Sequence, residues 1–304
     1  MAATRIAKTN VTCLAVLCFY LTLPAGVQAQ AWVPAKGDGV ASFTYQSLQA
    51  RYHLNYLGQR VNPGQIRTHT TVMGFEYGIT DRLALNADVA YVASRYKGER
   101  PESAIDDGSF HPTLQDSHLD IRFNAIKKPL VLTPFVAVTL PTHDYQTLGH
   151  SAVGRDLHDL SIGLNVGREL DPVLQNVYVH GRYSYAMLNH IEGLDLNRSN
   201  ADWEVGWFAT RFFSLRFLGA WQHTQGGLDF GVPHTPEEHE NHDRGARARY
   251  VRLGGGVTIP VNSSFDLDAA YLATVSGINT HALGGIAIGI SWRFSKGFSL
   301  DRIH

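Results

Sequence analysis

Residues 82–93 read RLALNADVAYVA, and this stretch decides the fold. From Leu83 onward every second residue is apolar, and the residues between them are a mixture of polar and apolar side chains. A β-strand points successive side chains to opposite faces, so this period of two predicts a strand with one wholly apolar face. The apolar face holds Leu83, Leu85, Ala87, Val89, Tyr91 and Ala93, and the mixed face holds Ala84, Asn86, Asp88, Ala90 and Val92.

The same alternation recurs along most of the chain. It is clear over 117–124, 159–167, 177–187, 265–275 and 286–294. Weaker segments lie near 39–52, 65–78, 130–140, 201–210, 214–224 and 248–259. Together with 82–93 these segments predict about twelve strands, each long enough for a tilted crossing of a bilayer, which takes about 9–11 residues.

The connections between these strands alternate in length. Short turns are expected at 78–81, 126–129, 169–174, 211–213 and 260–264, and longer loops at 54–64, 97–113, 141–156, 188–200, 225–246 and 276–282. Bacterial outer-membrane barrels keep short turns in the periplasm and long loops outside. The pattern therefore predicts an all-β fold, a transmembrane up-and-down antiparallel β-barrel with both termini in the periplasm. The alternative is a secreted β-sandwich or lipocalin-like barrel, which also alternates but does not usually have strands this long.

The first 29 residues are expected to be a cleaved signal peptide. Arg5 and Lys8 precede an apolar stretch over 11–23, and Val27-Gln28-Ala29 offers a small-residue cleavage site. The apolar stretch is shorter than the about 20 residues that a membrane-spanning helix needs. We therefore expect an exported protein of the bacterial outer membrane with one barrel domain, residues 30–304.

Composition limits the partners. Both cysteines of the chain lie in the leader, so the barrel itself has none. Without Arg5 and Lys8, 24 basic residues face 27 acidic ones, a formal charge of −3, and no basic patch predicts a nucleic-acid partner. The expected partners are outer-membrane lipid and lipopolysaccharide, the barrel-assembly machinery during biogenesis, and a small-molecule solute. No cofactor is expected.

Three stretches carry a family resemblance. Residues 74–85 read GFEYGITDRLAL, residues 138–144 read VTLPTHD, and residues 154–157 read GRDL. They resemble the "YGITDRL" hairpin, the strand end "LPTGD" and the following glycine and aspartate of the outer-membrane barrel family named after the meta-cleavage pathway of phenol degradation. His143 stands where that pattern has glycine. The resemblance implies a channel or uptake role for small molecules and supplies no catalytic residues.

Charged residues and histidines on the inferred inner face are the candidate functional residues. They could line a narrow polar pore and set its selectivity, or pair as salt bridges that fill the lumen. Barrels of about eight strands are filled inside and those of about sixteen hold an aqueous channel, so a twelve-stranded barrel leaves both interpretations open. The set is Glu76, Asp88, His118, Asp120, Arg122, Asp159, His180, Arg182, Glu204, Arg216, Arg252, Asp266, Asp268 and Arg293.

Two further kinds of site are considered. The loop over 224–245 carries His234, His239 and His242 among acidic residues, which suits a divalent metal although the spacing matches no specific zinc signature. For an enzyme, His180 and Ser184 share one face but lie about 13 Å apart along a strand, too far for a nucleophile and its base. No G-x-S-x-G or H-E-x-x-H is present, and we expect no enzymatic activity.

The sequence thus favours an outer-membrane channel or passive transporter for small solutes, with hydrophobic and aromatic ones as candidates. A structural or adhesive barrel with a plugged lumen, acting through its extracellular loops, is the alternative. An outer-membrane hydrolase is the third hypothesis.

Overall fold

A computed structural model describes residues 30–62, 64–99, 101–191, 193–233, 235 and 243–295. The signal peptide expected over 1–29 lies outside these residues. So do His234, His239 and His242, the three histidines of the predicted metal loop.

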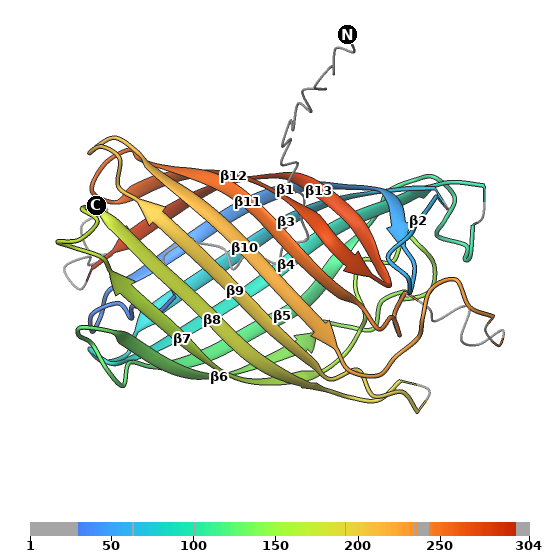
Figure 1. Ribbon diagram of the computed structural model, residues 1–304, viewed down its shortest axis with the longest axis horizontal. Coiled ribbons are helices and arrows are strands. Elements are labelled where there is room, and N and C mark those ends of the chain that lie inside the picture. The colour runs from blue at the N-terminus through green and yellow to red at the C-terminus, as the bar shows by residue number, and fades with distance from the viewer. Residues whose placement is uncertain are drawn as a thin grey trace, which may run out of the picture.

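The fold is a closed antiparallel β-barrel, as predicted (Figure 1). Each strand pairs with its neighbour in sequence, and β13 pairs with β1 to close the ring, from Gly39↔Phe294 to Leu54↔Thr280. The strands are β1 Gly39–Leu54, β2 Arg60–Val61, β3 Gln65–Gly78, β4 Leu83–Lys97, β5 His111–Phe123, β6 Val131–Pro141, β7 Asp159–Glu169, β8 Val177–Leu188, β9 Arg198–Trp207, β10 Ser214–Thr224, β11 Arg249–Pro260, β12 Phe265–Ile278 and β13 Thr280–Phe294.

Twelve of these strands form the wall, and β2 is a two-residue addition. It pairs only with the end of β1, through His53↔Val61 and Leu54↔Arg60. The loop expected over 276–282 is wrong, because β12 and β13 extend into it and only Asn279 separates them. Asn279 has a positive φ of 49°, which is the left-handed region that asparagine tolerates better than most residues.

The connections define two ends of the barrel. The short-turn end carries the connections over 79–82, 124–130, 170–176, 208–213 and 261–264, together with both ends of the described chain. The long-loop end carries those over 55–64, 98–110, 142–158, 189–197 and 225–248, and it is the end where β2 is labelled in Figure 1. In outer-membrane barrels these ends face the periplasm and the outside respectively.

The outer surface of the barrel is apolar. On β13, the side chains of Ile286, Ile288 and Ile290 are 47%, 54% and 42% exposed, while Ala287 between them is buried. A soluble protein buries such side chains, but a lipid-facing wall exposes them, because the hydrocarbon layer takes the place of a protein core. Aromatic side chains gather near the short-turn end of this surface, where Phe75 stacks on Phe294.

Among the described residues, no helix is long and apolar enough to cross a membrane.

Candidate functional site

The lumen at the short-turn end is occupied by the start of the described chain. Ala31 is completely buried, and its carbonyl oxygen accepts a hydrogen bond of 2.5 Å from the Thr133 hydroxyl and one of 3.4 Å from the Asn124 amide. Trp32 packs edge-on against the ring of Tyr178, with centroids 6.1 Å apart. Residues 30–32 therefore form an inner plug, which fills this part of the barrel without belonging to its wall.

Asp120 lies at the centre of the first charge network beside the inner plug. Its carboxylate lies 3.1 Å from Nε of Arg122, 3.6 Å from Arg182 and 3.6 Å from the His118 ring. Arg122 also reaches Glu76 at 2.6 Å. These five predicted lumen residues come from three strands, β3, β5 and β8, none of which pairs with another of the three.

The two arginines of this network also hold the inner plug. Arg122 donates a hydrogen bond of 3.0 Å to the Gln30 carbonyl, and Arg182 donates one of 2.6 Å to the Gln30 side chain. The guanidinium of Arg182 also lies 3.6 Å from the centre of the Phe135 ring, a cation–π contact.

A second network joins β9, β10 and β12. Arg216 is 3.8 Å from Glu204 and 3.2 Å from Asp268. The Tyr178 hydroxyl donates to Glu204, and the Thr258 hydroxyl donates to Asp268 at 2.6 Å. Each of these carboxylates therefore receives a neutral donor as well as the arginine, which is how buried charges are made tolerable.

The remaining predicted lumen residues are placed as follows. Asp266 pairs with Arg293 at 3.0 Å, and Asp159 pairs with Arg198 at 2.9 Å. The guanidinium of Arg252 lies 3.1 Å from the centre of the Tyr250 ring. Asp88 and His180 line the interior cavity.

That cavity has a volume of about 590 Å³ and lies above the inner plug, with Gln30 in its floor. It extends to the long-loop end, where His150 and His281 line it. Its charged lining comes mostly from β5 and β7–β9, although Leu188 and Trp203 also line it there. Much of its apolar lining comes from β1, β3, β4, β10 and β12, and includes Leu48, Ile66, Val72, Val92, Leu218 and Leu272.

Sequence reasoning missed this apolar wall. Alternation shows which residues point inward, but only the charged residues and histidines of the inner face were named as candidates. Val92 and Ala90 already lie on that face in the opening stretch, and they cluster with Val72 inside the barrel. Asp202 was missed too, although it lies two residues before Glu204 and therefore shares its face; it is exposed to the cavity.

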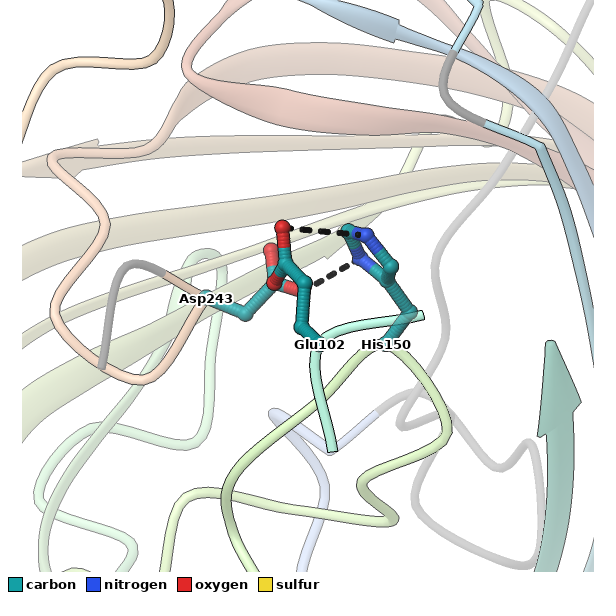
Figure 2. Close-up of side chains that lie close together, drawn as sticks. All are labelled: Glu102, His150 and Asp243. Atoms are coloured by element: carbon teal, nitrogen blue, oxygen red, sulfur yellow. Dashed lines mark hydrogen bonds and ion pairs between the residues drawn. The ribbon is translucent and has the colours of Figure 1, made fainter. Parts of the chain in front are cut away.

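The predicted metal site of His234, His239 and His242 lies outside the described residues and stays a prediction. His180 and Ser184 lie four residues apart on β8, a separation of about 13 Å along the strand, which is too far for a nucleophile and its base. A different group at the long-loop end could hold a metal. It consists of Glu102, His150 and Asp243, whose ligand atoms all lie within 4.8 Å of one another (Figure 2).

No protein-family model and no curated protein matches the chain by sequence. Solved structures do match. An outer membrane channel from Pseudomonas putida F1 has a TM-score of 0.69 and 12% identity, covering 88% of this chain and 99% of that one. The translocator domain of the autotransporter NalP from Neisseria meningitidis has a TM-score of 0.49 and 13% identity, covering 86% of this chain and 90% of that one. The P. putida toluene transporter TodX has a TM-score of 0.43 and 8% identity, covering 88% of this chain and 92% of that one. Identities this low show the fold alone: the chain has the fold of an outer-membrane β-barrel.

Proposed function

We propose that this protein is a passive outer-membrane channel for small solutes with a hydrophobic or aromatic body. The observation that carries the proposal is the interior cavity of about 590 Å³ with one apolar and one charged side. Small-molecule sites are clefts of about 300–1,000 Å³ with mostly apolar linings and a few polar groups. An aromatic ring against Val72, Ala90 and Val92, which cluster together in the lining, would be favoured at about 25 cal/mol per Å² of apolar surface removed from water.

The polar side of the cavity gives the solute a second requirement. Asp202 and His180 lie on β9 and β8, across from the apolar wall. A solute with a hydroxyl or amino group on an apolar body could contact both sides at once. The fourteen charged and histidine residues then divide into two proposed roles. Those lining the cavity contact solute or water, and those outside its lining, such as Arg122 and Arg216, hold the barrel closed around the inner plug.

The inner plug supports the main alternative. Hydrogen bonds from Arg122, Arg182 and Thr133 fix residues 30 and 31 in the lumen, so passage to the short-turn end requires their displacement. If the plug never leaves, the protein is a structural or adhesive barrel that acts through its long loops. Displacement of the plug is therefore the step that separates the two functions.

The setting proposed for this function is the bacterial outer membrane, reached after removal of residues 1–29. We propose lipopolysaccharide, membrane lipid and the barrel-assembly machinery as partners, with no nucleic acid and no cofactor. The resemblance to the meta-cleavage family remains a prediction, and a hydrolase remains the third hypothesis, to be tested on lipid and peptide substrates.

Gly167 offers a way to test the plug. A Cβ built at this position would lie 2.6 Å from Cβ of Ala31 and 2.8 Å from the Trp32 ring, closer than real contacts allow. Overpacking of this kind costs about 1–3 kcal/mol. Gly167→Ala should therefore raise the population with a displaced plug by about tenfold, because each 1.4 kcal/mol is a factor of about ten.

The measurement is single-channel conductance of refolded residues 30–304 in planar bilayers. We expect more frequent or longer openings for Gly167→Ala than for the parent. Gly181→Ala is the matched control, since its added Cβ would meet only the Asp202 carbonyl at 3.9 Å. Silence of all three proteins, with heat-modifiable gel migration showing folded barrels, would favour the plugged alternative.

A further inference from the structure

Three connections at the long-loop end bring a histidine between two carboxylates. Glu102 belongs to the connection between β4 and β5, His150 to that between β6 and β7, and Asp243 to that between β10 and β11. Nε2 of His150 lies 3.3 Å from Glu102, and Nδ1 lies 3.2 Å from Asp243. Figure 2 shows both carboxylates pointing at the imidazole ring from separate segments of the chain.

Two more histidines surround this group. Nε2 of His281, at the start of β13, lies 3.0 Å from the second oxygen of Asp243. The His53 ring, near the end of β1, has its centre 4.0 Å from that of His281 and 5.6 Å from that of His150. Three imidazoles and two carboxylates from five separate segments thus converge on one place.

The group is shielded from solvent. The side chain of His150 is only 2% exposed, and those of Glu102, Asp243 and His281 are 13%, 16% and 14% exposed. Exposed acidic residues gather on many surfaces without any ligand, but buried charges are costly and are found paired or holding a metal. His150, Asp243 and His281 also line the interior cavity, which gives an ion a route to the site.

The group offers both kinds of ligand atom that a transition metal takes. His150 presents ring nitrogen, and Glu102 and Asp243 present carboxylate oxygens from two other loops.

We propose that Glu102, His150 and Asp243 bind a divalent transition metal of the zinc class, with His281 orienting Asp243 from behind. Imidazole nitrogen together with carboxylate oxygen suits zinc, copper or nickel, whereas calcium and magnesium take oxygen ligands alone. A hydrogen bond from a second residue to a ligating carboxylate is the usual support of such sites. The bound metal takes the place of the proton on His150, and that proton leaves to solvent.

A metal binds only one ring nitrogen of His150, so the carboxylate that now contacts the other nitrogen must move, and the three ligand atoms must also come closer together. Zinc ligands at about 2.1 Å in a tetrahedron lie about 3.4 Å from one another, and the three ligand atoms here lie within 4.8 Å. All three come from loops, which can move by this amount more easily than the strands. Binding would tie three loops together beside the cavity, independently of whether the barrel conducts solutes.

The experiment is zinc titration of metal-free, refolded residues 30–304 by calorimetry. We expect one site that weakens about 100-fold or more in His150→Ala and in the near-isosteric Glu102→Gln. Loss of an outer-shell partner usually costs about 10–100-fold, so His281→Asn should fall in that range. The matched control is His190→Ala, which removes an exposed histidine 2.5 Å from Asp195 in another long loop.

Cobalt supplies a second readout, since its visible absorption band reports four-coordinate nitrogen and oxygen ligation. That band should appear with the parent and His190→Ala and be lost in His150→Ala. Gel migration shows that each variant is folded. The proposal is overturned if the parent binds no zinc. It is also overturned if His150→Ala and Glu102→Gln bind zinc as the parent does, with the affinity lost instead in a variant lacking His234, His239 and His242.

Discussion

Arg122 is the largest fully buried side chain among the described residues, and it shows how the lumen tolerates charge. Its guanidinium contacts Glu76 at 2.6 Å and Asp120 at 3.1 Å, and it donates to the Gln30 carbonyl at 3.0 Å. One residue thus joins the barrel wall to the inner plug. A buried ion pair adds little stability by itself, but its partners depend on it once they have left water.

Removal of this arginine should therefore destabilise the barrel. Arg122→Met keeps most of the side-chain volume but leaves Glu76 and Asp120 facing each other, at a cost of about 3–5 kcal/mol. Denaturant unfolding of the barrel in detergent measures this loss of stability. The double variant Arg122→Met with Glu76→Gln should recover part of the loss, because it removes one unpaired charge. A single variant as stable as the parent would mean that the plug region is wetter than its burial indicates.

At the scale of elements, period-two alternation located all twelve wall strands. The signal survives because each strand has lipid on one side and the lumen on the other, so side chains must switch environment at every residue. The residues at which the strands end were harder to predict. β12 and β13 part from each other after Ala273↔Gly284, yet each continues by pairing with its other neighbour, β11 or β1. Local turn residues such as Ser276 and Gly277 carry no information about that pairing.

The candidate sites were also predictable to different degrees, because alternation informs about strand residues and not about loops or about contacts between distant strands. Alternation places Arg216 and Glu204 on the inner face, but only the closed barrel brings Arg216 to Asp268, 52 residues later. The inner plug precedes the first strand and has no periodicity at all. Glu102, His150 and Asp243 come from three loops, where composition alone cannot show which side chains meet.

The inside–outside assignment of one strand can be tested directly. Leu164, in the middle of β7, is 37% exposed on the outer face, and arginine near the bilayer midplane costs about 2–4 kcal/mol. Leu164→Arg should lose that much stability. The neighbouring Asn165 is unsuitable as a control because it is fully buried against Thr133. Asn200→Arg, which lines the cavity on β9, should cost far less. If Asn200→Arg lost more stability than Leu164→Arg in lipid-vesicle unfolding, the inside–outside assignment would be wrong.

At the scale of the whole molecule, closure of the sheet creates the two-sided cavity. β5 and β7–β9 carry most of its charged lining, and β1, β3, β4, β10 and β12 carry many of its large apolar residues. An apolar solute with one polar group can contact both kinds of lining inside the barrel, and its passage should depend on the space against the apolar residues.

Ala90 and Ala87 on β4 allow the cavity side and the lipid side of one strand to be tested separately. Ala90 lines the cavity and is buried, whereas Ala87 has the opposite parity and faces outward. Ala90→Trp places an indole in the cavity, so uptake of benzyl alcohol into proteoliposomes should fall severalfold. Ala87→Trp adds the same ring to the lipid side, where aromatic residues are common, and uptake should stay near that of the parent. Equal uptake by both variants would show that solutes do not cross through this cavity, and would leave the long loops as the place where the protein acts.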